Sequence, residues 1–142
     1  MLKNISKDLS PELVKTLMEM GHGDEIVIAD GNFPAASHAK NLIRCDGLSA
    51  SQLLTSILKF LPLDTYTEYA VTLMAIVDGD DVKPTIWKDY QDIIRSSNTE
   101  NQSINYIDRF EFYDRSKKAY AIIATGEEAL YANLLLRKGV VI

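Results

Sequence analysis

Cysteine is almost absent from this chain, since Cys45 is the only one among 142 residues. One cysteine excludes an internal disulfide, and it excludes a zinc site built on a Cys-x-x-Cys pair. The fold must therefore be stabilised by packing, and we expect association between copies of the chain to contribute as well.

Long hydrophobic runs are missing too. The longest apolar stretch covers residues 70–77, interrupted by Thr72, which is far below the roughly 20 residues that a membrane span requires. Residues 1–8 lack the apolar core of a secretory signal. We therefore expect a cytoplasmic protein without a membrane-spanning segment.

Basic character and the familiar catalytic signatures are equally scarce. The net charge is −5, and no basic stripe or RNA-binding signature is present, which argues against a nucleic-acid partner. There is no nucleophile elbow, zinc-protease motif, phosphate-binding loop or complete dinucleotide fingerprint. His22, Asp24 and His38 match no standard metal spacing. We expect chemistry without a metal and without a cofactor.

The length fits one domain over residues 1–142, large enough to bury roughly 68–70% of its unfolded surface. Apolar runs bounded by turn residues alternate with segments of helical spacing. The pattern predicts helices over residues 11–20, 84–95 and 109–118, and one more helix that begins at Ser49 or Ser51 and ends at residue 61. It predicts strands over residues 25–30, 41–45, 69–77, 119–125 and 133–136, and a loop over 96–103. Such alternation, with strands that are apolar throughout, predicts an α/β fold of three layers, α/β/α, with a mostly parallel or mixed sheet.

His22 is the first candidate for chemistry. It lies between Gly21 and Gly23, in the turn that joins a helix to a buried strand. Flanking glycines let a ligand and the backbone approach closely, and an imidazole both takes and gives a proton near neutral pH. A turn histidine with only local hydrogen bonds fits the spacing equally well.

Asp30 ends the apolar strand, where ligand groups gather in open α/β sheets. An aspartate that only initiates a turn fits as well. Residues 25–30 extend over roughly 17 Å at about 3.3 Å per residue, and His22 lies further back. If the strand is straight, His22 and Asp30 of one chain cannot contact the same small ligand. They meet only if the chain doubles back or if a neighbouring subunit supplies one of them.

Further polar candidates lie late in the chain. Arg109 is next to Phe110, which favours a packed stem and a guanidinium aimed at a partner. Tyr131 and Asn133 point the same way if their segment is extended. The alternative for Tyr131 is a core tyrosine whose hydroxyl is satisfied, and Tyr113 and Tyr120 face the same alternative.

These motifs, in this order, resemble the L-fucose mutarotase and D-ribose pyranase family. The resemblance runs from Leu2 to Val140. Its most specific parts are Met-Gly-His-Gly-Asp-Glu-Ile at residues 20–26, Thr-Gly-Glu-Glu at 125–128 and Tyr-Ala-Asn at 131–133. Asn-Phe-Pro-Ala-Ala-Ser at 32–37, with Arg-Phe and Phe-Tyr near residue 110, is similar to the fucose branch.

The resemblance implies an isomerase that interconverts the α and β anomers of L-fucose by cofactor-free acid–base chemistry. It also implies a ring-shaped homo-oligomer, usually a decamer, with sites between neighbouring subunits. By resemblance His22 is the general acid/base and the substrate-binding set is Asp30, Arg109, Tyr131, Ala132 and Asn133, with Tyr113, Tyr120 and Asp24 as additional candidates. Gly31-Asn32 stands where many fucose-type members have Ala-His, which concerns fine specificity.

Three alternatives stay open. A relative acting mainly on D-ribose would use the same site. A non-catalytic subunit that binds fucose for regulation would not accelerate anomer exchange. A purely structural ring-forming protein leaves the Gly-His-Gly and Tyr-x-Asn motifs without a purpose.

Overall fold

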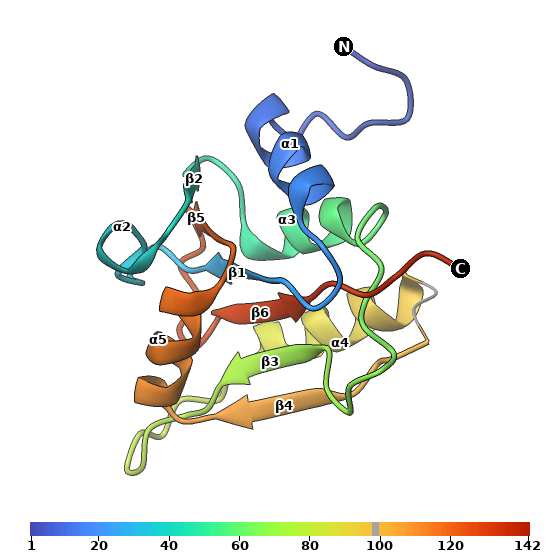
Figure 1. Cartoon of the computed structure of the whole chain (residues 1–142). Coiled ribbons are helices and arrows are strands. Elements are labelled where there is room, and N and C mark those ends of the chain that lie inside the picture. The colour runs from blue at the N-terminus through green and yellow to red at the C-terminus, as the bar shows by residue number, and fades with distance from the viewer. Residues whose placement is uncertain (98–99) are drawn as a thin grey trace.

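Helices and strands alternate along the chain in the computed structural model, which describes residues 1–97 and 100–142 (Figure 1). In chain order they are α1 (Pro11–Glu19), β1 (Glu25–Ala29), α2 (Ala35–His38), β2 (Leu42–Cys45), α3 (Ala50–Ile57), β3 (Val71–Met74), α4 (Ile86–Ser96), β4 (Ile104–Ile107), α5 (Arg109–Lys118), β5 (Ala121–Thr125) and β6 (Leu134–Arg137).

The strands form one six-stranded sheet in the order β2-β5-β1-β6-β3-β4. β6 pairs antiparallel with both β1 and β3, whereas the pairs β1–β5, β2–β5 and β3–β4 are parallel. Five strands therefore end at one edge of the sheet, and β6 begins there. We call this the Asp30 edge, and the opposite one, where β1 begins and β6 ends, the His22 edge.

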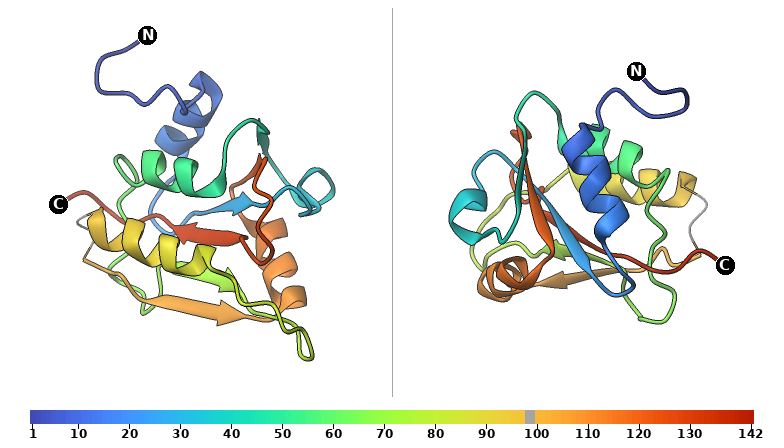
Figure 2. Two further views of the ribbon diagram at one scale, coloured as in Figure 1. Left: turned by 180° about the vertical axis from the view of Figure 1, so that it is seen from behind. Right: turned by 45° about the horizontal axis from the view of Figure 1, so that its top comes forward.

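Helices cover both faces of the sheet (Figure 2). Ile26 and Ile28 of β1 belong to the core beneath α1, α3 and α4. Val27 and Ala29 point the other way, into the core that contains Phe112 of α5. This confirms the predicted α/β/α layering with a mixed sheet, because β1 is buried on both faces.

Helix starts follow their capping residues. Ser10 caps α1 by accepting a hydrogen bond from the Leu13 amide at 3.1 Å. Ser49 rather than Ser51 caps α3, because Ser49 and Gln52 form a reciprocal capping box. α5 has the predicted bounds, and the strands of residues 25–30, 41–45, 119–125 and 133–136 are confirmed within one or two residues at each end.

The structure differs from prediction at several places. α3 ends at Ile57 rather than at residue 61, and residues 58–60 form a turn. The expected strand over residues 69–77 is only Val71–Met74, because the chain leaves the sheet after it and Val77 is 40% exposed. The short α2 and the edge strand β4 were not predicted, and β4 buries only part of its side chains, so it lacks a long apolar signal. In the predicted loop 96–103, Ser96 belongs to α4 and residues 98–99 lie outside the described residues.

Candidate functional site

His22 projects from a tight turn at the His22 edge. Gly23 has φ of +85° and donates from its amide to the Lys138 carbonyl at 2.8 Å, so the turn is held against the chain that follows β6. The Nε2 atom of His22 lies 3.1 Å from Oδ1 of Asp64, 42 residues away in sequence. The imidazole is 46% exposed, so it reaches solvent while one nitrogen is held. This bond is long-range, which removes the interpretation of His22 as a locally bonded turn residue.

Asp64 is a buried carboxylate, with its side chain 2% exposed. Its Oδ2 accepts a hydrogen bond from Nε of Arg137 at 3.0 Å, and Oδ1 also accepts from the Tyr66 amide at 3.0 Å. Burial on its own raises the pKa of Asp64, but hydrogen bonds from Tyr66, His22 and Arg137 outweigh it, and the pKa is lowered.

The ionised state of Asp64 determines the tautomer of His22. An ionised carboxylate only accepts hydrogen bonds, so Nε2 of His22 carries the proton that it donates to Asp64. The other ring nitrogen, Nδ1, is then an acceptor in the neutral imidazole. His22 therefore has one ring nitrogen available for proton transfer.

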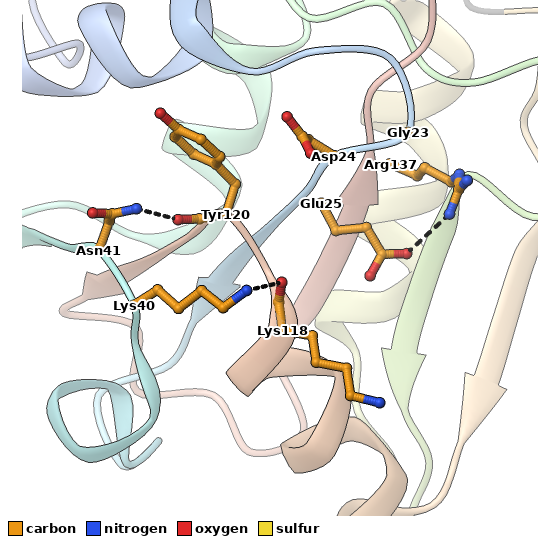
Figure 3. Close-up of a pocket in the computed structure, with 8 residues that line it drawn as sticks. All are labelled: Gly23, Asp24, Glu25, Lys40, Asn41, Lys118, Tyr120 and Arg137. Carbon is orange, nitrogen blue, oxygen red and sulfur yellow. Dashed lines mark hydrogen bonds and ion pairs between the residues drawn. The ribbon is translucent and has the colours of Figure 1, made fainter.

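Two of the additional candidates lie beside this turn, around a hollow of about 380 Å³ (Figure 3). The Asp24 carboxylate accepts a hydrogen bond from the Gly21 amide at 2.7 Å and so closes the turn that carries His22. Tyr120 donates its hydroxyl to Glu19 at 3.1 Å, and its pKa is raised by desolvation and by that bond. Tyr120 is half-buried rather than a core tyrosine.

Asp30 and Asn133 hold each other at the Asp30 edge. The Asp30 amide donates to Oδ1 of Asn133 at 2.8 Å, and Nδ2 of Asn133 donates to Oδ2 of Asp30 at 2.9 Å. Oδ1 of Asp30 accepts from the Asn32 amide at 3.0 Å, so Asp30 also shapes the turn. Both side chains are buried, and Asn133 therefore fixes the position of the Asp30 carboxylate.

The Asp30 carboxylate is less acidic than usual. Desolvation by burial raises its pKa, and hydrogen bonds from Asn32, Asn133, Phe33 and Ala132 offset that effect only in part. A carboxylate at this strand end, partly stripped of water, is suited to accept a strong hydrogen bond from a ligand hydroxyl.

Tyr131 lies beside this pair, but its backbone is not extended as predicted. Its φ is +56°, a left-handed conformation that is uncommon for a tyrosine. The conformation is held because Nε1 of Trp87 donates to the Tyr131 carbonyl at 2.8 Å and the Tyr90 hydroxyl donates to the Ala132 carbonyl at 2.7 Å. The Tyr131 hydroxyl donates to the exposed Asp80 at 2.5 Å, so Tyr131 is not a core tyrosine.

Arg109 and Tyr113 come from α5, which begins where β4 ends. Arg109 is exposed, and its guanidinium lies 4.7 Å from the centre of the Phe110 ring. Tyr113 is half-buried and packs edge-on against Phe33 at 5.5 Å and His38 at 5.3 Å between ring centres. The predicted packed stem of Arg109 is replaced by stacking on one ring.

The structure thus separates the sequence candidates into two groups. His22, Asp24 and Tyr120 lie at the His22 edge, whereas Asp30, Ala132 and Asn133 lie at the Asp30 edge with Tyr131. β1 is continuous over its five residues and separates the two groups by roughly 17 Å. The chain does not double back, so the two groups of one copy do not surround one small ligand.

Sequence reasoning missed three residues that shape these groups. Asp64 is a buried acid, Arg137 ends β6, and Trp87 is the only tryptophan in the chain. A buried aspartate with a distant histidine partner leaves no periodic signal, because its contacts are long-range. Arg137 does leave a weak signal in the sequence, because a charged residue ends an otherwise apolar strand.

The described part of the chain contains neither a membrane-spanning helix nor a cluster of metal ligands. Within residues 1–97 and 100–142, none of the helices has the length and hydrophobicity needed to cross a bilayer. In the same residues no three His, Cys, Asp or Glu side chains are grouped so that they could hold a metal ion.

The fold is a three-layer α/β domain with an imidazole–carboxylate pair at one edge of its sheet and a buried, hydrogen-bonded polar set at the other. Residues 3–141 match the RbsD / FucU transport protein family, and the chain belongs to that family. It is 50% identical to the human fucose mutarotase over an alignment of 145 positions, which covers 98% of this chain and 94% of that protein. It is 46% identical to the L-fucose mutarotase of Haemophilus influenzae Rd over 140 residues, covering 99% and 97% of the two chains.

Solved structures show the same fold. The crystal structure of the fucose mutarotase from Streptococcus pneumoniae in complex with L-fucose has a TM-score of 0.95 and 56% identity, over 99% of this chain and 100% of that one. Bacillus subtilis RbsD complexed with D-ribose has a TM-score of 0.74 and 25% identity, with both chains covered in full.

Proposed function

We propose that this protein is an L-fucose mutarotase, a carbohydrate isomerase that interconverts the α and β anomers of L-fucopyranose in the cytoplasm. The proposal is supported by relatives of 46–50% identity that are named fucose mutarotase and L-fucose mutarotase. A fold neighbour of 56% identity that binds L-fucose supports the substrate. The D-ribose-bound neighbour is more distant in both identity and TM-score, which favours fucose over ribose.

The chemistry requires proton transfer only. A pyranose changes anomer when its ring opens to the aldehyde and closes on the opposite carbonyl face. Opening removes the proton of the anomeric hydroxyl and delivers a proton to the ring oxygen. One neutral imidazole with a polar partner performs both transfers, and each positioned acid–base group contributes typically about 10²–10⁴-fold.

His22 is the proposed proton carrier, and the paired Asp64 supports that role. Asp64 holds Nε2 of the imidazole at 3.1 Å, which leaves Nδ1 as the nitrogen that takes the proton. When His22 becomes an imidazolium, the ionised Asp64 stabilises the new charge, because the two groups are already in contact. Proton transfer then needs no rearrangement of the imidazole ring of His22.

The sugar is held at the Asp30 edge. Asp30 accepts a hydrogen bond from a sugar hydroxyl, while Asn133 positions its carboxylate. Tyr131 and the backbone of Ala132 extend the polar surface, and Arg109 stabilises negative charge that develops on oxygen during ring opening. Tyr113, which packs against Phe33 and His38, adds an aromatic ring suited to the apolar face of a 6-deoxysugar.

The observation that carries the assembly proposal is the position of His22 and Asp30 at opposite ends of β1. A site that needs both is completed when the His22 edge of one copy faces the Asp30 edge of the next. Such a head-to-tail contact is heterologous, and heterologous contacts give a ring when the rotation between copies closes and a filament when it does not. We propose a ring of this kind, with a decamer as the expected size.

Exchange of magnetisation between the α and β anomers of L-fucose, followed by NMR, tests the function. Purified protein should accelerate exchange over buffer, faster for L-fucose than for D-ribose, and His22→Ala should remove the acceleration. Calorimetric titration of His22→Ala with L-fucose provides the control, because the Asp30 edge is intact and binding should persist. Binding by the wild type without acceleration would instead identify a regulatory sugar-binding subunit.

A further inference from the structure

The loop that follows β3 holds the hydroxyl of Tyr131 from two sides. Oδ2 of Asp80 accepts the phenolic proton at 2.5 Å, and the amide of Val77 donates to the same oxygen at 3.4 Å. No sequence motif pointed to Asp80, which is exposed and lies 51 residues from Tyr131 in the chain. Asp80 and Val77 of one loop thus both contact the Tyr131 hydroxyl.

The loop is built so that Asp80 keeps its position. The Asp80 amide donates to the Val77 carbonyl at 3.0 Å, and Gly79 between them has φ of +87°. Oδ1 of Asp80 accepts from the Val82 amide at 3.1 Å. Oδ1 of Asp80 thus stabilises the loop, and Oδ2 stays directed at Tyr131.

The backbone of Tyr131 is fixed independently of this loop. Its left-handed conformation is held by Trp87 of α4, whose indole donates to the Tyr131 carbonyl at 2.8 Å. A non-glycine residue in this conformation costs free energy and persists where the surroundings hold it, often at functional sites. The phenol is therefore anchored at the backbone by α4 and at the hydroxyl by the loop.

These contacts determine what Tyr131 offers to a ligand. A phenolic hydroxyl has one proton, which Asp80 accepts, and its oxygen already accepts from the Val77 amide. The remaining capacity of that oxygen is as an acceptor. A charged acceptor also polarises the O–H bond and makes the phenol oxygen a stronger acceptor in turn.

We propose that Asp80 is a positioning residue that acts through Tyr131, so that Tyr131 accepts a hydrogen bond from a sugar hydroxyl and donates none to the sugar. The inference rests on the proposed function, because it assigns the direction of one contact in that site. It predicts that the sugar hydroxyl facing Tyr131 is a donor. Replacing it with hydrogen or with a methyl ether removes that contact.

The test measures kcat and KM for anomer exchange in Asp80→Ala, Asp80→Asn and the control Asp81→Ala. Asp81 lies in the same loop, is exposed and also carries a negative charge, so its loss reproduces the change in net charge. Asp80→Ala should lower kcat/KM by ~10-fold, since hydrogen bonds to charged groups are among the stronger ones. Asp80→Asn keeps a carbonyl that accepts the phenolic proton and should recover part of the loss, whereas Asp81→Ala should match the wild type.

A second comparison separates positioning from a structural role. In a Tyr131→Phe background, Asp80→Ala should cause no further loss, because the hydroxyl through which it acts is gone. An equal loss in both backgrounds, or a lower melting temperature with kcat and KM unchanged, would overturn the proposal. A wild-type protein that fails to accelerate exchange would refute the proposed function itself, which is a distinct result.

Discussion

His22 and Asp30 lie beyond the two ends of β1, so one strand separates the proposed proton carrier from the buried carboxylate. If the two act on one sugar, they come from different copies of the chain. Two variants that are inactive on their own should then restore exchange activity when they are mixed. In mixed oligomers of His22→Ala and Asp30→Asn, random assembly across a heterologous contact gives intact pairs at about a quarter of the interfaces.

We therefore predict that co-refolded His22→Ala and Asp30→Asn recover about a quarter of wild-type exchange activity, by the same interface count. Each variant refolded alone should stay inactive, and the double variant mixed with itself is the matched control. The NMR exchange rate measures recovery, and light scattering checks that mixed and unmixed samples have the same mass. Failure to recover activity in oligomers shown to be mixed would contradict a site shared between two copies.

Asp64 is predicted to control the tautomer of His22. In Asp64→Asn the amide can turn its NH₂ group toward the imidazole, so Nε2 is no longer obliged to carry the proton. We expect kcat for exchange to fall by roughly 10²-fold, the lower range for a positioned acid–base group. Asp92→Asn is the control, because the half-buried Asp92 pairs with Lys88 on α4, away from His22 in sequence. An unchanged kcat in Asp64→Asn would contradict the assignment of Nδ1 as the working nitrogen.

How far sequence predicts this molecule depends on the range of each contact. The α5 helix and the strand ending at Asp30 are encoded locally, by capping, apolar runs and turn residues. The separation of His22 from Asp30 also follows from local spacing. The partners of His22 and Tyr131 do not, because Asp64 and Asp80 reach them across 42 and 51 residues. The left-handed Tyr131 was missed for the same reason, since a distant tryptophan holds it.

Asp30 and Asp64 should influence stability with opposite dependence on pH. The pKa of Asp64 is lowered in the folded protein, so its stabilisation is present above its ordinary pKa of 3.8 and is lost as pH falls through the folded value. The pKa of Asp30 is raised, so folding favours its protonated form, and stability falls as pH rises from 3.8 through the folded value.

Urea unfolding of the wild type, Asp30→Asn and Asp64→Asn, at fixed protein concentration across acidic pH, measures both effects. The free energy of unfolding of wild type minus Asp64→Asn should increase with pH, and wild type minus Asp30→Asn should decrease. Using differences removes the titration of the other carboxylates, which all three proteins share. Two differences that change in the same direction would contradict the opposite shifts.

Gly139 offers a way to disturb Asp64 without changing any charge. A Cβ at Gly139 would lie 2.7 Å from the Leu63 carbonyl oxygen and 2.8 Å from Cα of Asp64, both backbone atoms. Gly139→Ala should therefore push that segment away and lower the free energy of unfolding by about 1–3 kcal/mol, as overpacking usually does. Exchange should also slow, because the segment carries the carboxylate that holds His22.

Gly47→Ala is the matched control, since a Cβ there meets nothing within 4 Å, and its stability and exchange rate should stay near those of the wild type. If Gly139→Ala unfolded earlier but exchanged anomers at the wild-type rate, the position of Asp64 would not limit the proton transfer at His22.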